Sequence, residues 1–163
     1  MNVKMDHKKK FLDELFLKFS GKETHILDMG SGTSSNFIQL LKNNNKFYYT
    51  GIEFNKKSYA QAQSNLKGFE NVILFNGYGE ELKDKLNTYD LVLSLSVLEH
   101  VKYLEKFLVH SISMCKPGGI VVHRYDLGDS LYPCSFGEQL NVWLCKRFPF
   151  AISKKNVLLH ILH

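Results

Sequence analysis

Short apolar segments alternate with amphipathic segments along this chain, and this alternation predicts its secondary structure. Segments of strand character are residues 25–29, 48–54, 72–75, 90–95 and 119–125. Segments with apolar residues at helical spacing lie between them, at 37–41, 56–66 and 101–114, and a further helical stripe precedes them at Phe11, Leu12, Leu15, Phe16 and Phe19. Strands separated by helices of this length indicate βαβ units and a mainly parallel sheet.

The end of the chain carries weaker signals. Residues 82–86 predict at most a short helix, 140–148 a helix, and 157–162 one further strand. About 37 residues follow Asp126, and Pro149 and the polar run 153–156 interrupt them. At about 5–6 residues per strand plus turns, this length barely holds a helix and a two-stranded return. We therefore expect at most six strands, with the open edge of the sheet covered by a helix, a neighbouring chain or additional sequence.

Ligands of parallel sheets bind at the carboxyl ends of the strands, so the residues that follow each strand are the candidates for a site. The first predicted strand runs into Asp28-Met29-Gly30-Ser31-Gly32. Glycines permit open backbone conformations and let a ligand approach closely. This loop by itself is compatible with a plain βα turn and with the start of a dinucleotide fingerprint.

Two observations argue against NAD. The sixth position of the fingerprint is Ser35 rather than Gly or Ala. A carboxylate at Asp28 would repel a pyrophosphate, whereas it suits a ligand that carries an ammonium and a sulfonium group. Glu53 ends the second predicted strand about 20 residues after the loop, where an acid can accept hydrogen bonds from both ribose hydroxyls.

Three segments together resemble class I S-adenosylmethionine (SAM) dependent methyltransferases, in particular bacterial small-molecule enzymes of type 11/12. They are the first-strand motif at residues 26–32, the fourth-strand motif at residues 89–101 and the Lys-Pro-Gly-Gly turn at residues 116–119. The resemblance implies a Rossmann-like three-layer α/β/α sandwich that lacks the complete carboxyl-terminal β-hairpin. It implies a single domain over residues 1–163, with a core at 20–126 and an acceptor-side segment at 127–163.

The same resemblance implies SAM as the cofactor and suggests its contacts. They are the loop residues Asp28, Gly30, Ser31 and Gly32, then Glu53 and Phe54 after the second strand, Tyr78 and Gly79 after the third, and Ser94 and Leu95 at the fourth. Family members often have an Asp where this chain has Tyr78, so the usual acceptor for the adenine amino group is missing or replaced, and an aromatic ring can stack on the base instead. The segment 123–130 is similar to a His-x-x-Asp-Leu-x-Asp-His pattern, with Ser130 in place of the last His.

Two histidines are candidate general bases for a hydroxyl acceptor, because the pKa of His lies near neutral pH. His100 follows the fourth strand, and His123 lies toward the end of the fifth. The alternative for each is a structural histidine whose ring nitrogens are satisfied by hydrogen bonds. No metal site is predicted, since His123 and Asp126 alone are a thin ligand set.

Composition narrows the class of function only slightly. The formal net charge of +5 attracts phosphate without demonstrating nucleic-acid binding, and the three cysteines, Cys115, Cys134 and Cys145, show no paired spacing, which favours a reducing cytoplasm. No apolar run is long enough to span a membrane.

The leading hypothesis is methylation of a small-molecule acceptor at oxygen, and a homodimer is compatible with it. The alternatives are an RNA or protein methyltransferase, and a non-catalytic SAM-binding partner subunit.

Overall fold

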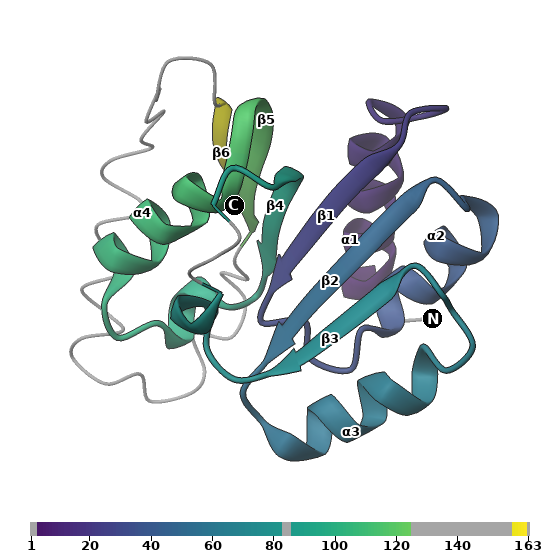
Figure 1. The fold of residues 1–163 in the computed structure, drawn as a ribbon, viewed down its shortest axis with the longest axis horizontal. Coiled ribbons are helices and arrows are strands. Elements are labelled where there is room, and N and C mark those ends of the chain that lie inside the picture. The colour runs from purple at the N-terminus through teal and green to yellow at the C-terminus, as the bar shows by residue number, and fades with distance from the viewer. Residues whose placement is uncertain (1–2, 83–85, 125–157, 163) are drawn as a thin grey trace.

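The computed structural model describes residues 3–82, 86–124 and 158–162 (Figure 1). Its helices are α1 (Val3–Leu17), α2 (Ile38–Asn43), α3 (Lys56–Asn65) and α4 (Leu104–Met114), with short 3₁₀ helices η1 (Ser35–Phe37), η2 (Gly79–Glu81) and η4 (Leu98–His100). Its strands are β1 (Thr24–Met29), β2 (Phe47–Glu53), β3 (Val72–Asn76), β4 (Tyr89–Leu95), β5 (Cys115–Arg124) and β6 (Leu158–Leu162).

The strands form one sheet in the order β3-β2-β1-β4-β5-β6, and every neighbouring pair is parallel. The order reverses at β1, which pairs with β2 on one side and β4 on the other. The carboxyl ends of these strands are therefore the place where this type of sheet binds a ligand.

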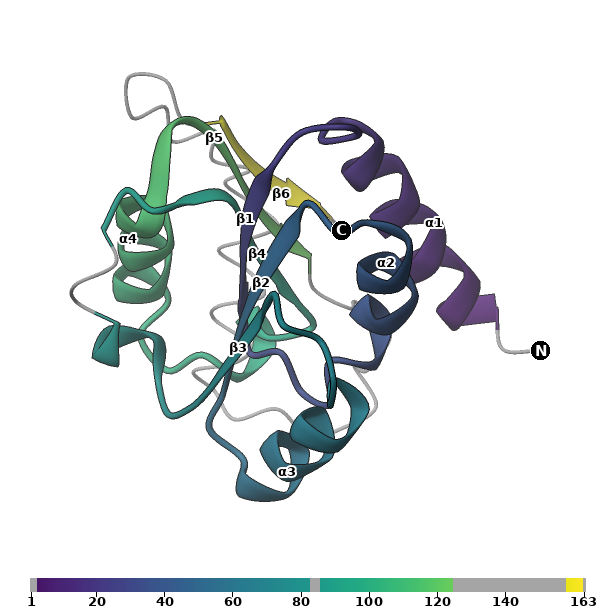
Figure 2. The same ribbon diagram turned by 45° about the vertical axis from the view of Figure 1, so that its right-hand side comes forward.

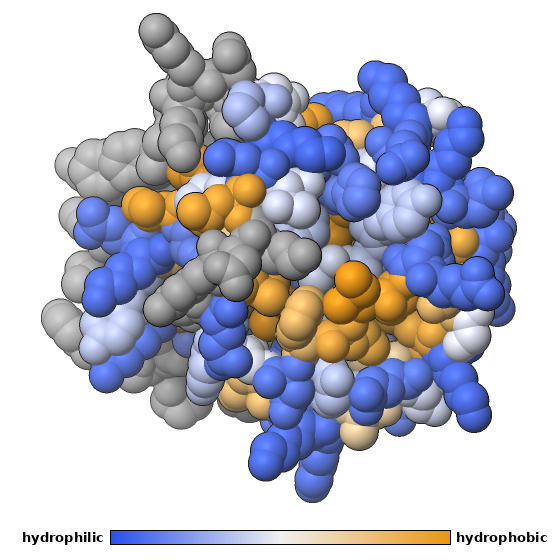
Figure 3. All heavy atoms as spheres, viewed as in Figure 1, coloured by the Kyte–Doolittle hydropathy of each residue, from blue (hydrophilic) through white to orange (hydrophobic). Residues whose placement is uncertain are grey.

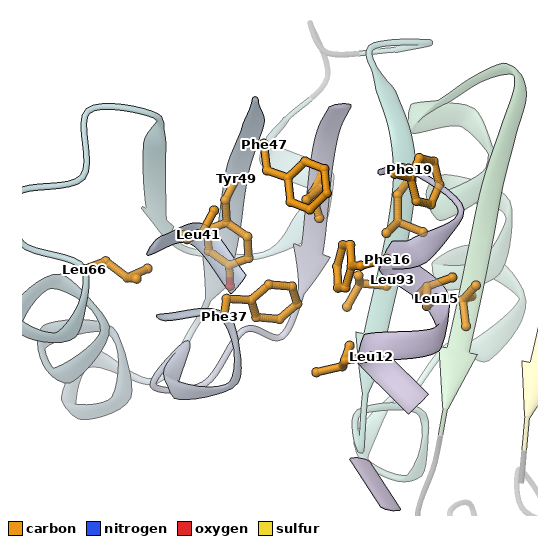
Figure 4. Packing of buried hydrophobic residues seen from close by; sticks show 13 residues of the cluster. Leu12, Leu15, Phe16, Phe19, Phe37, Leu41, Phe47, Tyr49, Leu66 and Leu93 are labelled. Carbon is orange, nitrogen blue, oxygen red and sulfur yellow. The ribbon is translucent and has the colours of Figure 1, made fainter. Parts of the chain in front are cut away.

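Helices cover both faces, which gives the three predicted layers. α1, α2 and α3 lie on one face and α4 lies on the other (Figures 1 and 2). Phe16 of α1 joins the helix to the first core layer, because its ring lies 5.9 Å from that of Phe37 and 5.6 Å from that of Phe47 (Figure 4). Ile112 and Met114 of α4 pack against Val92 and Val121 on the opposite face.

Most predicted elements are confirmed to within a few residues. α1 starts well before the predicted stripe, and its buried residues Leu12, Leu15 and Phe16 are those of the stripe. The helix predicted from residue 101 begins at Leu104, and η2 ends at Glu81, just before the short helix predicted at 82–86. Residues 83–85, the helix predicted at 140–148 and the cysteines Cys134 and Cys145 lie outside the described residues.

The fifth strand begins earlier than the Lys-Pro-Gly-Gly turn predicts. Its pairing with β4 jumps from Tyr89↔Cys115 to Leu91↔Ile120, so residues 116–119 form an irregular step within the strand. A Cβ on Gly119 would lie 2.9 Å from the carbonyl oxygen of Asp90, and Lys116 Nζ binds both oxygens of the Asp90 carboxylate at 2.9 and 3.0 Å. Residues 116–119 therefore form an irregularity within β5, and the ion pair between Lys116 and Asp90 stabilises it.

The described residues contribute six strands. β6 runs parallel to β5, from Ile120↔Leu158 to Arg124↔Leu162. The strand predicted at 157–162 is therefore present as β6. None of the described helices is long and apolar enough to cross a membrane.

Candidate functional site

The loop after β1 is held by the strand beside it and by the segment after β4. Gly30 has φ +84°, and its N–H and that of Ser31 both donate to the carbonyl oxygen of Ile52, at 2.9 and 2.8 Å. A Cβ on Gly30 would lie 2.6 Å from a methyl group of Val97. Gly30 is thus required by its backbone conformation and by close packing, and the N–H groups of Gly30 and Ser31 are already used.

Gly32 differs from Gly30 because open space lies beside it. Its φ is +56°, and a Cβ there would meet no atom within 4 Å. Its N–H donates to Glu53 Oε2 at 2.8 Å. Gly32 is therefore the loop glycine past which a ligand can approach the backbone.

Glu53 joins the loop to the end of β2. Its carboxylate is nearly buried, with Oε2 accepting from Gly32 and Oε1 accepting from the N–H of Asn55 at 2.7 Å. Each carboxylate oxygen retains a second lone pair. The residue predicted to hold a ribose thus already fixes the loop, and can accept further hydrogen bonds only from the open side.

Asp28 lies behind the loop. Its side chain is 3% exposed, and Tyr49 Oη donates to Asp28 Oδ2 at 2.8 Å. Burial raises the pKa of Asp28 to about 7, against the lowering effect of the Tyr49 hydrogen bond and with a small further rise from the Glu53 charge. The Tyr49 hydroxyl also lies 3.1 Å from Ser34 Oγ, which donates to it because the single phenolic proton is used on Asp28.

This arrangement changes the part predicted for Asp28. A carboxyl group that is buried and bonded to Tyr49 does not line an open pocket, so we propose that it acts on a ligand through its charge from behind the loop. The sequence did not indicate Tyr49, since a tyrosine in a buried strand is typical of a core residue. The sequence also did not indicate Ser34, whose φ is +53°.

The segments after β2 and β3 present two parallel aromatic rings. Phe54 and Tyr78 stack with ring centroids 5.6 Å apart and ring planes 7° apart, and they are 60% and 63% exposed. The Tyr78 backbone N–H donates to Glu81 Oε1 at 3.1 Å, and Gly77 N–H donates to the carbonyl oxygen of Glu53 at 3.2 Å. Two flat apolar faces therefore stand at the carboxyl edge, next to Glu53.

Gly79 connects this edge to α4. His110 Nε2 donates to the carbonyl oxygen of Gly79 at 2.7 Å. A Cβ on Gly79 would lie 3.0 Å from the terminal methyl of Met29. Gly79 thus has a packing role in the structure, and His110 is a positioning residue that the sequence did not indicate.

His123 and Ser94 lie in the interior between the sheet and α4. His123 is fully buried, with Nδ1 2.8 Å from Ser94 Oγ and Nε2 2.9 Å from Ser111 Oγ. Ser111 Oγ donates to the carbonyl oxygen of Leu108, so it accepts from His123 Nε2–H, and Ser94 donates to Nδ1. Burial lowers the pKa of His123 to about 3, which keeps the ring neutral.

This geometry speaks against two of the predicted roles. A histidine whose two nitrogens are occupied and which has no exposed surface does not reach an acceptor, and we propose a structural role for it. Ser94 points its hydroxyl at His123 and is fully buried, and we propose that its side chain has a structural role in place of the predicted cofactor contact. Alternation along a strand fixes which residues share a face but not which face is open.

His100 and Leu95 lie where the sequence placed them, just after β4 or at its end. Leu95 is half-buried, and the next residue, Ser96, turns the chain with φ +58° while its N–H donates to Arg124 O at 2.7 Å. His100 ends η4 and is exposed. Among the described residues no three His, Cys, Asp or Glu side chains gather into a metal site.

Comparison with known proteins assigns this chain to a family. The model of the methyltransferase domain family matches residues 5–154. The chain is 32% identical over 95 residues to a ubiquinone biosynthesis O-methyltransferase of Paramagnetospirillum magneticum, a match that covers 58% of this chain and 37% of that protein. It is 30% identical over 106 residues to norajmaline N-methyltransferase of Rauvolfia serpentina, which covers 63% and 36%.

A solved structure shows the same fold at lower identity. A protein of Methanococcus maripaludis described as a SAM-dependent methyltransferase superposes with a TM-score of 0.62 at 15% identity, over 86% of this chain and 64% of that one. The fold is thus that of class I SAM-dependent methyltransferases, as the motifs predicted. The chain belongs to the methyltransferase domain family, and it spans about a third of the length of the two curated relatives.

Proposed function

We propose that the chain binds SAM at the carboxyl edge of its sheet and transfers the methyl group to a small-molecule acceptor, with oxygen preferred over nitrogen. The observation that carries the proposal is the hydrogen bond from Gly32 to Glu53, which joins an open glycine to a carboxylate with spare lone pairs. The relatives named as methyltransferases of ubiquinone biosynthesis and of norajmaline support a small-molecule acceptor. Oxygen is preferred because the sequence lacks an Asn/Asp-Pro-Pro-aromatic tetrapeptide.

The residues present fit SAM better than a dinucleotide. SAM supplies a methyl group on a positively charged sulfur, and Asp28 and Glu53 place two acidic groups beside the loop. Glu53 can accept the ribose hydroxyls, and the exposed rings of Phe54 and Tyr78 can stack on the adenine. A pyrophosphate at the loop would lie in front of the Asp28 charge and be repelled by it.

Calorimetry with SAM and S-adenosylhomocysteine tests the proposed cofactor site. Tyr78→Ala removes one face of the aromatic pair, and we expect SAM binding to weaken by about 1–3 kcal/mol, the usual worth of a base–aromatic stack. Glu53→Gln replaces one acceptor oxygen by an NH₂ group that faces a backbone N–H, and we expect a loss on the order of 1.5–3 kcal/mol.

The matched control is Tyr48→Ala, because Tyr48 is also an exposed tyrosine but stacks on His25 at the amino end of β2. Its SAM affinity should equal that of the unmodified chain. A folded chain that binds no SAM, or a Tyr48 variant that loses as much affinity as the Tyr78 variant, would overturn this assignment of the site.

We propose His100 as the general base for a hydroxyl acceptor, because it is exposed and follows β4 at the carboxyl edge. His100→Ala should lower kcat by about 10²–10⁴-fold while leaving SAM affinity unchanged. Transfer of a labelled methyl group to hydroxylated small molecules, measured across pH, checks this expectation.

His25→Ala is the control, since His25 lies at the amino end of β1, at the opposite end of the strands from the proposed site. Full turnover by the His100 variant would show that His100 is not the general base. Transfer to RNA or protein in place of small molecules would support the second hypothesis, and SAM binding without transfer to any acceptor class would support a non-catalytic partner subunit.

A further inference from the structure

Among the described residues no further strand pairs with the outer edge of β3, and β3 lacks the sequence features that usually keep edge strands from pairing. β3 is the first strand in the sheet order and pairs only with β2 among the described residues. Its five residues, Val-Ile-Leu-Phe-Asn, include no charge and no proline. Natural edge strands usually carry lysines, prolines or bulges that block pairing with another chain.

The backbone groups that face outward follow from the pairing with β2. Asn71 O accepts from Tyr49 N–H at one end of the pair, and Gly77 N–H donates to Glu53 O at the other. Since parallel ladders use alternate residues, Ile73 and Phe75 also bond to β2. The N–H and C=O groups of Val72, Leu74 and Asn76 therefore point away from the sheet.

The side chains divide between the two faces in the same alternation. Val72 and Leu74 pack against the first core layer. Ile73 is 55% exposed and Phe75 is 37% exposed on the other face, and Figure 3 shows apolar residues gathered over the β3 region on that face. The edge thus combines outward-facing backbone groups with an adjacent pair of exposed apolar side chains.

We propose that this edge joins a second copy of the chain, with the two β3 strands antiparallel about a twofold axis at Leu74. In this register Leu74 lies opposite Leu74 of the second copy and Val72 lies opposite its Asn76, so all outward N–H and C=O groups form the hydrogen-bonded pairs of an antiparallel ladder. Two copies of one strand close into a dimer, because the interface is self-complementary.

The side chains match in the same register. Ile73 lies opposite Phe75 of the second copy, twice, in the non-hydrogen-bonded positions where side chains approach most closely. A β-branched residue facing an aromatic one is a favourable cross-strand pair. No like charges meet, because the strand carries none. A partner of other sequence would need to supply this match, whereas a second copy supplies it by symmetry.

Tyr59 of α3 is the contact that the second copy would displace. Its hydroxyl lies 3.5 Å from Leu74 O, at the limit of a hydrogen bond, and it accepts a hydrogen bond from Gln63 at 3.1 Å. The contact also confirms that Leu74 O points away from β2. A backbone N–H of the second copy would replace this long contact by a shorter hydrogen bond that is aligned with the carbonyl along the ladder.

Sedimentation of the full chain over a range of concentrations tests the proposal and its register. We expect a reversible dimer, weakened at least about tenfold by Ile73→Lys alone or Phe75→Glu alone, since each removes both cross-strand pairs. The double variant should recover most of the affinity, because each lysine then faces a glutamate of the other copy. Val109→Lys, at an apolar position on α4 that is 58% exposed, is the control and should dimerise unchanged.

Thermal melting of each variant confirms that it is folded, and both changes lie at exposed side chains. A chain that stays monomeric at the highest concentration would overturn the proposal. A dimer that the single variants leave unchanged, or that the double variant weakens further, would overturn it as well, since the contact would then lie elsewhere or in another register.

Discussion

Asp28→Asn should stabilise this protein strongly at pH 8 and much less at pH 5. The carboxyl group of Asp28 is buried, and its pKa rises from 3.8 to about 7. Because the folded state holds the proton more tightly, this group contributes most to stability below about pH 4, and that contribution is lost as pH rises toward 7. At pH 8 the buried charge costs on the order of 4 kcal/mol.

Asparagine removes that cost and keeps the contact with Tyr49, since its amide oxygen accepts from the hydroxyl that now bonds to Asp28 Oδ2. The free energy of unfolding, measured with denaturant at pH 5 and pH 8, should therefore rise most at pH 8. SAM affinity should fall in the same variant, because the loop loses a negative charge behind a positively charged ligand.

Asp90→Asn is the matched control with the opposite sign. Asp90 bonds to Lys116 and to the His25 N–H, so its charge is compensated and its removal should destabilise the chain at pH 8. If Asp28→Asn instead destabilises the chain equally at both pH values, the carboxyl group does not carry a buried charge and the account of the loop is wrong.

His123→Ala should destabilise the protein by about 3–5 kcal/mol, because it removes a fully buried ring and leaves the Ser94 hydroxyl without its partner. The ring also contacts Phe107, with centroids 5.4 Å apart. His123→Asn retains one donor and one acceptor and should lose less. Denaturant unfolding at neutral pH measures both.

The pH dependence of stability separates this role from catalysis. Burial lowers the pKa of His123 from 6.5 to about 3, so the unfolded chain binds its proton more readily. The unmodified chain should therefore lose up to about 5 kcal/mol of stability from this group as pH falls from about 6.5 to 3, and neither variant should show that loss. A His123→Asn variant that is fully folded, binds SAM and has lost its turnover would instead restore the catalytic role.

The two buried groups act in opposite directions between about pH 4 and pH 6.5. There the folded state binds the extra proton at Asp28, and the unfolded state binds it at His123. The two slopes largely cancel in the unmodified chain. Asp28→Asn should expose a stability that rises with pH over this range, and His123→Asn one that falls.

The sequence by itself determined the order of strands and helices, the parallel sheet and the loop after β1. These follow from local signals, namely apolar periodicity and the glycines at a strand end. Gly32 and Glu53 were predicted together because both lie at strand ends of one sheet edge, and the structure joins them directly. Tyr78 was placed at the same edge by the family resemblance, and the structure shows that its ring is exposed there.

Only the tertiary structure decided which way the polar side chains of the buried strands point. β4 is buried on both faces, so its pattern of apolar and polar residues does not reveal that Ser94 faces α4. Nor does it reveal that Ser94 contacts His123. Tyr49 reaches Asp28 across 21 residues of sequence, and β6 lies parallel to β5 although no local signal specifies its direction. Such contacts depend on which faces meet when the layers pack, and local periodicity carries no information about that choice.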